Sequence, residues 1–508
     1  MPPVLLALAT LLLAGLLRLV WRARRSPLRP VPGPLLSSLS NLPLLLHVVR
    51  GTYIAHARSL HARYGPVVRI GVDQVSVADV GALRHILSSH SFRKGRAYEA
   101  NIFLVPTTFS TTSPDVNRAR RRQTGQCYTL PHLRRLEPRI LEHGAQALVR
   151  LWDARMARAE PVNYFYAFHA LAFDVIGELG FGRSFGLLAS GSTRPTDNVH
   201  RMMQLAVLQG TLPLLRRFTW PVRRHIAGRA ELIAIAEDAI RRRRQDNAAG
   251  RKSADADADI LQHLLDARDP ATGAPLDADS LVSELVMLLV AGTDTTSSTL
   301  TWATMHLLHH PDVALRLRRA LCRRFPDRAA WITYDEARAE PLLTAVLLES
   351  MRLLPAASGY LPRRVPQPQG ASVLGFHVPA DAEINVALAA CHRDAATWPD
   401  PHAFRPERFL GEDAEARARD VLAFSLGVRA CVGRSLAWIE LYTVMANVLR
   451  RYALVLPEDA PYGPHRSGPD GLPEDVPCAT FLTCAPSNPQ RDCWVRLLPA
   501  EDALGCDD

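Results

Sequence analysis

The stretch FSLGVRACVGRS, residues 424–435, places a single cysteine, Cys431, between two glycines. Gly427 and Gly433 let the backbone turn sharply and come close to another group. The apolar segment LAWIELYTVMANVL follows at once, and its spacing predicts a helix. Cys431 is therefore expected in a tight loop at a helix N-terminus, where free N–H groups and the helix dipole stabilise a thiolate. On its own, the stretch also fits an ordinary buried cysteine.

Length and composition describe a large protein with an arginine-rich positive charge. The 508 residues are 48% hydrophobic, which is enough for one large domain or two. The formal net charge is +10, and Lys94 and Lys252 are the only lysines. The arginines are spread along the chain without a zinc-finger or RNA-binding motif, so no nucleic-acid partner is expected. Eight cysteines without a CxxC pair argue against a disulfide framework and favour a reducing compartment.

The N-terminus predicts a membrane anchor. Residues 4–21 are apolar over about the length of one membrane span, with Arg18 reaching back to the interface. The basic run RARR follows this segment, whereas a cleaved signal peptide carries its positive charge in front. The positive-inside rule then keeps the rest of the chain in the cytosol. We therefore expect an anchor over residues 1–25, a proline-rich hinge and linker over 26–51, and a globular domain over 52–508.

The globular part is predicted to be mostly α with small β-sheets. Residues 67–80 alternate around a turn and predict a hairpin, helical periodicity dominates residues 118–262, and a long helix is expected over 277–309. Exposed loops are expected at residues 188–198 and 245–259. The apolar stretch at residues 202–222 fits either core or a second surface that dips into the membrane. Short strands follow residue 354, and helix returns at residue 436.

Two further motifs add polar groups to apolar helices. AGTDTT, residues 291–296, brings an acid and hydroxyls into an apolar helix, and Gly292 leaves room for something flat against the backbone. A buried acid is costly unless it has a role such as proton delivery, although a kink with solvent-facing polar residues is also possible. In ESMR, Glu349 and Arg352 lie on one helix face and can pair. Such a pair, if buried, needs a further partner, and Arg408 of FRPERF could supply it.

Taken in this order, AGTDTT, ESMR, PERF and FSLGVRACVG resemble the cytochrome P450 superfamily, the heme-thiolate monooxygenases, in its microsomal type. The specific pattern FxxGxRxCxG is complete at residues 424–433. The resemblance covers nearly the whole chain, including the anchor and the proline-rich hinge. It implies the cytochrome P450 fold, a single N-terminal transmembrane helix and heme b as cofactor.

The resemblance also implies roles for individual residues. Cys431 would be the axial thiolate ligand of the heme iron, with loop N–H groups near Gly433 bonding the sulfur. Arg429 would pair with a heme propionate, and Phe424 would pack against the ring. The remaining expected cofactor-binding residues are Arg121 and Arg363, which reach the propionates, and Ala291, which leaves room above the ring.

The acid–alcohol pair and the buried ion-pair group are implied in the same way. Asp294 and Thr295 would organise water and deliver protons to dioxygen. Glu349, Arg352 and Arg408 would form a structural triad that locks the core on the heme side.

Two positions depart from the family pattern or are ambiguous. Asn117 stands where the family has a tryptophan or histidine that reaches a propionate, and it is too short to copy that contact. In GYLPRRVP, either Arg363 or Arg364 fits the propionate-binding arginine, and the register of LPRxVP favours Arg363.

The predicted function is oxidation of a lipophilic small molecule with dioxygen and electrons from NADPH. The chain has no GxGxxG or flavin module, so a separate NADPH-cytochrome P450 reductase is expected, with cytochrome b5 as a further candidate partner. The anchor argues against a soluble bacterial type, and FDVIGELGFGRSFG at residues 173–186 and LPRRVP at residues 361–366 resemble fungal enzymes near benzoate 4-hydroxylase and pisatin demethylase. This resemblance implies secondary metabolism and an endoplasmic reticulum membrane. The expected pocket is formed by residues 98–108, 286–291, 356–361 and 480–483. The alternatives are a heme-thiolate isomerase or dehydratase that uses no dioxygen, and a non-catalytic membrane heme-binding protein.

Overall fold

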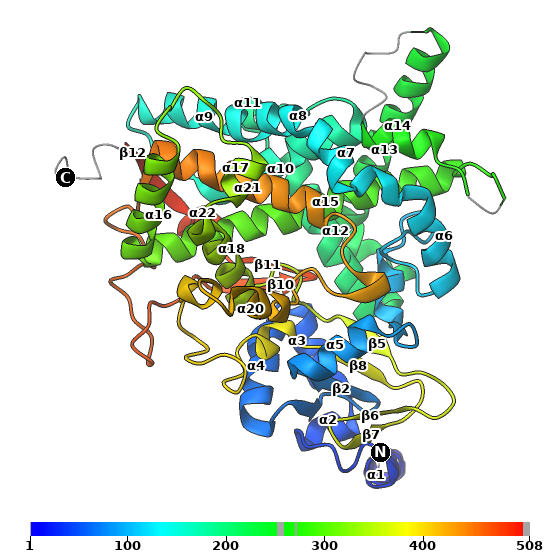
Figure 1. Cartoon of the computed structure of the whole chain (residues 1–508). Helices are drawn as coiled ribbons and strands as arrows, with labels where there is room; N and C mark the ends of the chain where they lie inside the picture. The colour runs from blue at the N-terminus through cyan, green and yellow to red at the C-terminus, as the bar shows by residue number, and fades with distance from the viewer. Residues whose placement is uncertain (1, 251–258, 270–271, 501–508) are drawn as a thin grey trace.

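The computed structural model describes residues 2–250, 259–269 and 272–500 (Figure 1). Of the predicted loop at residues 245–259, residues 251–258 lie outside the described residues, and residues 245–248 are not loop but the last turn of the helix α13 (Arg223–Ala248). Lys252, Cys506 and the end of the predicted domain at residues 501–508 also lie outside the described residues. The seven cysteines that are described are all free.

Helices make up most of the described chain. The longer ones are α1 (Pro2–Arg25), α3 (Leu42–Val49), α4 (Tyr53–Tyr64), α5 (Val80–Ser88), α6 (Pro114–Thr124), α9 (Ala147–Met156), α10 (Tyr164–Phe181), α12 (Arg194–Thr211), α13 (Arg223–Ala248), α15 (Ala278–His309), α16 (Pro311–Arg324), α18 (Pro341–Leu353) and α21 (Arg434–Arg451). The shorter ones are α2 (Leu35–Leu39), α7 (Leu130–Arg135), α8 (Glu137–Leu141), α11 (Leu187–Ser190), α14 (Ile260–Asp266), α17 (Tyr334–Arg338), α19 (Leu388–Cys391), α20 (Ala414–Asp420) and α22 (Pro489–Asp492).

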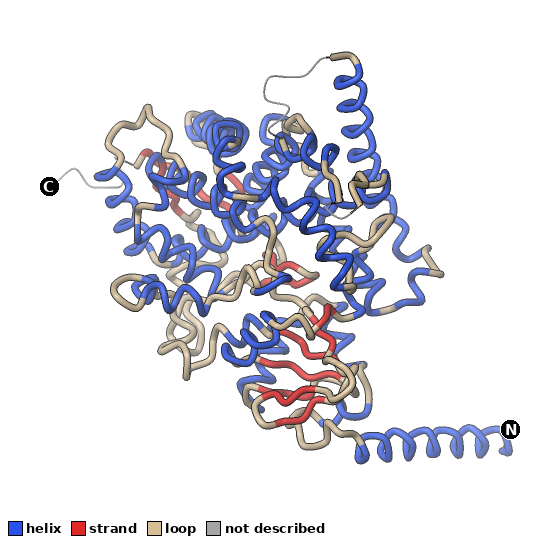
Figure 2. The backbone as a smooth tube through the Cα atoms, turned by 45° about the vertical axis from the view of Figure 1, so that its right-hand side comes forward, coloured by secondary structure: helices blue, strands red, loops and turns tan. Residues whose placement is uncertain are grey.

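The strands form four small sheets. The largest has the order β1-β2-β8-β5-β3 and lies below the helical body in Figure 2, beside the start of the chain. Its strands are β1 (Val67–Arg69), β2 (Gln74–Val77), β3 (Arg93–Lys94), β5 (Pro362–Arg364) and β8 (Glu383–Val386). The other sheets are formed by β4 (Val162–Asn163), β9 (Tyr452–Val455) and β12 (Trp494–Pro499), by β6 (Ala371–Val373) and β7 (Phe376–Val378), and by β10 (Cys478–Phe481) and β11 (Thr483–Pro486).

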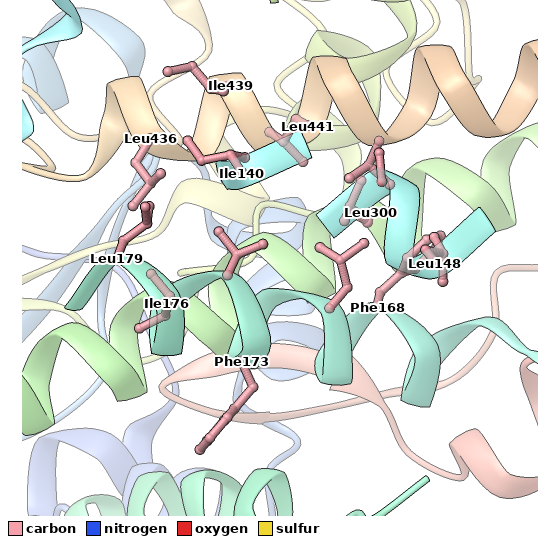
Figure 3. Close-up of a cluster of buried hydrophobic side chains, with 14 of the residues drawn as sticks. Ile140, Leu148, Phe168, Phe173, Ile176, Leu179, Leu300, Leu436, Ile439 and Leu441 are labelled. Atoms are coloured by element: carbon pink, nitrogen blue, oxygen red, sulfur yellow. The ribbon is translucent and has the colours of Figure 1, made fainter. Parts of the chain in front are cut away.

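The main core lies where α10, α15 and α21 pack together. Figure 3 shows side chains from these helices and from α8 and α9 interleaving, among them Phe168, Ile176 and Leu300. All three are buried. The helix α15 is buried along nearly its whole length and runs through the middle of the body, so its polar residues face other elements and not solvent. The mostly helical class with small sheets is confirmed.

Most elements agree with the sequence, and the two predicted loops agree only in part. The hairpin of β1 and β2 and the long helix α15 stand where the pattern placed them. Of the predicted exposed loop at residues 188–198, residues 191–193 are loop and exposed, whereas α11 ends at Ser190 and α12 already begins at Arg194. Asn198 and Val199 are buried in that helix. The Ser/Thr/Pro-rich composition there forms a helix start, in which Pro195 needs no N–H donor.

The N-terminal helix α1 stands apart from the body (Figure 2). From Val4 to Arg25 it is apolar and long enough to cross a membrane, and none of that apolar surface is buried by the protein. The proline-rich segment after it packs closely on the domain. Leu28 and Val31 are buried in the same apolar cluster as Val67, and the Arg69 N–H donates to the Pro32 carbonyl over 2.7 Å. The segment that follows α1 therefore makes a fixed contact with the domain near the largest sheet.

Candidate active site

The cysteine loop forms a tight turn in front of α21. The Cys431 N–H donates to the Phe424 carbonyl over 2.9 Å, and Gly433 caps the N-terminus of the helix. Gly427 has a φ of +65°, and a Cβ there would lie 2.8 Å from the Leu87 carbonyl oxygen at the end of α5. Glycine is therefore required at this position both by the backbone conformation and by the close approach of α5.

The Cys431 thiol is open to an internal cavity. Burial within the fold raises the pKa of this thiol, while the Gly433 N–H and the positive charges of Arg121, Arg434 and Lys94 lower it. The thiol and its loop line one wall of a cavity of about 280 Å³, together with Phe424. The sulfur thus faces the cavity, and the pKa of the thiol is raised because burial outweighs the groups that favour its anionic form.

Four basic side chains from separate elements gather at this cavity: Lys94 of β3, Arg121 of α6, Arg363 of β5 and Arg429 of the loop. Burial and the neighbouring arginines lower the pKa of Lys94 well below its usual value, and burial first, then Arg363 and Arg121, lowers that of Arg429 to about 10. Like charges held together inside a protein are unfavourable unless an anion joins them.

The protein itself supplies little to neutralise these cations. Arg363 donates to the Tyr98 hydroxyl over 3.0 Å, and Lys94 donates to the Phe109 carbonyl over 2.7 Å. Within the described chain, Nη1 of Arg429 and Nε of Arg121 are buried without a hydrogen-bond partner. The two acids at the cavity, Glu284 and Glu440, have a pKa raised by burial. The donor set therefore fits a ligand that brings its own carboxylates.

The helix α15 forms the wall that carries AGTDTT. Ala291, Gly292 and Thr295 line the cavity, and the Thr295 hydroxyl donates to the Ala291 carbonyl over 2.7 Å. A Cβ on Gly292 would lie 2.6 Å from the Ile176 side chain of α10. The missing side chain thus lets α10 approach α15, and the backbone of Gly292 also lines the cavity.

Asp294 lies away from the cavity that Thr295 lines. Its carboxylate accepts from the Thr483 hydroxyl of β11 and lies 3.4 Å from Nε2 of His169 and 3.2 Å from Nε2 of His200. Burial alone raises the pKa of Asp294, but the two imidazoles and the Thr483 hydroxyl outweigh it and bring the pKa to about 2. Successive helix residues point about 100° apart, so the acid and the alcohol occupy different sides of α15.

The two ambiguous positions have different surroundings. Asn117 is buried and donates to the Thr108 carbonyl over 2.9 Å, so it fixes the segment before α6 and is not among the cavity residues. Arg364 is paired with Asp381 at 2.6 Å on the outer side of the sheet. Of the two arginines of LPRRVP, Arg363 is the one that reaches the cavity.

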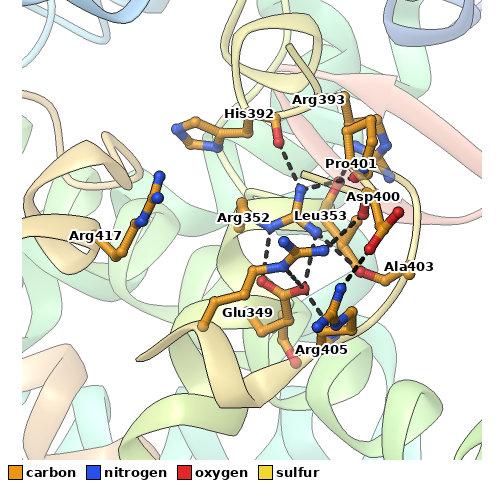
Figure 4. Close-up of polar contacts among 12 residues, drawn as sticks. Glu349, Arg352, Leu353, His392, Arg393, Asp400, Pro401, Ala403, Arg405 and Arg417 are labelled. Carbon is orange, nitrogen blue, oxygen red and sulfur yellow. Dashed lines mark hydrogen bonds and ion pairs between the residues drawn. The ribbon is translucent and has the colours of Figure 1, made fainter. Parts of the chain in front are cut away.

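The structure brings Glu349, Arg352 and Arg408 together, and Figure 4 shows Glu349 facing Arg352 and Arg405. Glu349 accepts from Arg352 Nε over 2.7 Å and from Arg352 Nη2 over 2.8 Å. The backbone N–H of Arg405 and Nε of Arg408 donate to it over 2.8 and 3.2 Å. Arg352 also donates to the carbonyls of residues 392, 401 and 403, which ties the loop before PERF to α18.

Three residues that the sequence analysis did not single out belong to these sites: Lys94, His169 and His200. Lys94 carried one usable signal, because it is one of two lysines in a chain that otherwise uses arginine. The two histidines lie on α10 and α12, more than 90 residues before Asp294 in the sequence, and no local motif links them to it.

The comparisons with known proteins agree with this arrangement. The cytochrome P450 family model matches residues 30–469. Two relatives from Aspergillus fumigatus, the cytochrome P450 monooxygenases helB3 and helB1, are 32% and 33% identical, over 93% and 92% of this chain and 93% and 81% of their own. The crystal structure of the cytochrome P450DA heme domain superposes with a TM-score of 0.76 at 20% identity, over 92% of this chain and 97% of that one. The chain belongs to the cytochrome P450 family.

Proposed function

We propose that the cavity holds heme b with the Cys431 sulfur as the axial ligand of its iron. The observation that carries this proposal is the meeting of one thiol and four basic side chains on a single enclosed cavity. Arg121, Arg363, Arg429 and Lys94 would bind the two propionates, which supply the carboxylates that these donors lack. Phe424, Gly433 and Ala291 also line the cavity and would lie against the ring. Bound there, heme supplies dioxygen activation, which a thiolate ligand favours.

Thr295 is proposed as the residue that handles protons on the wall formed by α15. Its hydroxyl lies on the cavity, and its bond to the Ala291 carbonyl fixes the oxygen in place. Asp294 can serve as the partner acid only when its carboxylate leaves His169, His200 and Thr483. Glu349, Arg352 and Arg408 hold the chain that leads into the cysteine loop and touch no reacting atom.

The substrate is proposed to be a lipophilic small molecule. The cavity wall includes Met287, Leu288, Ala356, Leu361 and Val386, all apolar. Met287, Leu288, Ala356 and Leu361 lie in the predicted segments 286–291 and 356–361, whereas Val386 lies in none of the four segments and residues 480–483 line other cavities. Apolar walls with a few polar groups are typical of sites for such ligands. The relatives are named as monooxygenases without a substrate, so a benzoate- or pisatin-type aromatic compound of fungal secondary metabolism remains a proposal based on residues 173–186 and 361–366.

Electrons are proposed to come from NADPH-cytochrome P450 reductase, with cytochrome b5 as a further donor, at an endoplasmic reticulum membrane. α1 is the anchor in this proposal. A second membrane contact is supported by the tip between α12 and α13, where Leu214, Phe218 and Trp220 are exposed while Met202 and Met203 are buried. The apolar stretch at residues 202–222 therefore divides into a core part and an exposed part.

The test is reconstitution of the full chain in microsomes with the reductase, with Cys431→Ser as the matched control. We expect the reduced carbon monoxide complex of the wild type to show the red-shifted Soret band of a thiolate ligand, and the variant to lose it. Candidate metabolites are then supplied and products identified by mass spectrometry. Products that form without dioxygen would indicate an isomerase or dehydratase. A spectral response to substrate without NADPH consumption would indicate a heme-binding protein without catalysis.

A further inference from the structure

Three ligand atoms from three helices meet beside α15, outside the heme cavity. They are Nε2 of His169 on α10, Nε2 of His200 on α12 and Oδ1 of Asp294 on α15, and all lie within 4.8 Å of one another. His169 and Asp294 are fully buried, and the His200 side chain is 31% exposed. Atoms of this kind, gathered from separate elements, are either joined by hydrogen bonds or arranged around a cation.

The contacts of Nδ1 in each of the two histidine rings show which ring nitrogen carries the hydrogen. Nδ1 of His169 lies 2.9 Å from the Phe165 carbonyl oxygen, and Nδ1 of His200 lies 3.0 Å from the Thr196 carbonyl oxygen. A carbonyl oxygen only accepts, so both Nδ1 atoms carry the hydrogen. In the neutral rings, both Nε2 lone pairs then point at a carboxylate. A cation held between these atoms would relieve this repulsion.

Two of the three spacings among the ligand atoms fit a metal ion, and the third, between the two Nε2 atoms, is at most 4.8 Å. The two Nε2–Oδ1 separations are 3.4 and 3.2 Å, and Nε2 of His200 has no hydrogen-bond partner within the described residues. Zinc bonds of about 2.0–2.1 Å in a tetrahedron separate neighbouring ligand atoms by about 3.3 Å. Histidine ligands of metals almost always donate their other N–H to a carbonyl or carboxylate, as both rings do here.

The surroundings supply the remaining parts of a metal site. The Thr483 hydroxyl donates to Oδ2 of Asp294 and holds the carboxylate in place. A cavity of about 210 Å³, lined by His169, His200 and Thr483, opens beside the three atoms. It gives an ion a path of entry and leaves room for water as a fourth ligand. Two histidines and one carboxylate with an open position form a donor set that zinc accepts.

We propose that His169, His200 and Asp294 form a binding site for a divalent transition-metal cation, with zinc as the ion that fits best. A bound ion would hold the Asp294 carboxylate on the side of α15 away from Thr295. Zinc would then inhibit the oxidation by withholding this acid. The binding site stands on geometry alone, whereas the inhibition rests on the proposed function.

The binding test uses the heme-loaded full chain, in which Cys431 is occupied by iron. Zinc is titrated in competition with a chromophoric chelator, and its ligands are determined by X-ray absorption at the zinc edge. We expect one equivalent bound by nitrogen and oxygen at about 2.0 Å, without sulfur at about 2.3 Å. His169→Gln and His200→Gln should each remove this equivalent. Thr483→Val, which takes away only the support of the carboxylate, should weaken it by about 10–100-fold.

The control is the stacked pair His47 and His56, whose ring centroids lie 3.8 Å apart outside this cluster. Replacing both with glutamine should leave the equivalent in place. The proposal is overturned if zinc binds equally well to the His200→Gln variant, or if its ligands include sulfur. The carbon monoxide spectrum verifies the fold of each variant, and His200→Asn replaces any glutamine variant that does not load heme.

Inhibition is measured separately, as product formed with and without zinc in the wild type and in His200→Gln. Zinc should lower the yield of the wild type alone. Zinc binding without any inhibition would overturn the link to Asp294 and leave the metal site standing. Absence of product in both proteins without zinc would instead contradict the proposed function.

Discussion

The buried carboxylate of Glu349 offers a sharp test of how this fold is held together. Glu349 and Arg352 are both fully buried, and the carboxylate accepts four N–H groups. Glu349→Gln keeps the shape, but it removes the charge and turns one oxygen into a donor that faces a guanidinium. Hydrogen bonds to charged groups contribute about 1.5–3 kcal/mol each, and leaving one partner of a buried pair alone costs about 3–5 kcal/mol. We expect the free energy of unfolding to fall by about 3–5 kcal/mol.

Glu440 on α21 provides the matched control, because it is equally buried but has no partner. Neither of its carboxyl oxygens is hydrogen-bonded within the described chain, and burial raises its pKa well above the usual value, which favours the neutral form. Glu440→Gln exchanges one neutral group for another and should change stability by less than about 1 kcal/mol. The assay is urea unfolding of the heme-loaded protein, followed by the Soret band. Equal losses for the two variants would refute the ion-pair reasoning.

Three further predictions concern the site and the membrane. Thr295→Ala should keep heme bound but raise the peroxide formed per NADPH consumed and lower product formation by about 10²–10⁴-fold. NADPH, peroxide and product are measured in the same reaction, and an unchanged product yield would exclude the hydroxyl from proton delivery. Lys94→Met should weaken heme retention, measured as heme lost to apomyoglobin, whereas Arg364→Met, on the outer side of the sheet, should not. Removing residues 2–25 should release the protein from membranes only in part, and adding Phe218→Ser and Trp220→Ser to the truncated protein should complete the release. Full release by truncation alone would show that the exposed tip between α12 and α13 binds no membrane.

Much of the fold could be predicted from the sequence because its strongest signals are local. The hairpin of β1 and β2, the helix α15 and the loop before α21 each depend on contiguous residues, and all lie where the patterns placed them. The start of α12 was missed because its Ser/Thr/Pro-rich composition fits a loop as well as a helix N-terminus. Only packing of Asn198 and Val199 against neighbouring elements distinguishes the two.

The basic cluster at the cavity shows a different limit. Arg429 could be predicted as a site residue because it stands inside the motif FxxGxRxCxG. Arg363 could be predicted because of its position in LPRxVP. Lys94 comes from a two-residue strand that pairs with β5, an antiparallel contact between segments about 270 residues apart. No periodicity marks such a residue. It becomes visible as a site residue only when the sheet has placed it beside Arg363 on the same cavity.

The pair Asp294 and Thr295 shows what a motif leaves undetermined. The sequence indicated that an acid inside an apolar helix needs compensation, and the structure supplies it from His169, His200 and Thr483. Because adjacent helix residues diverge by about 100°, a carboxylate satisfied on one side cannot also face the cavity on the other. The motif fixes which residues are present, and the residues packed around Asp294 determine which side of α15 its carboxylate occupies.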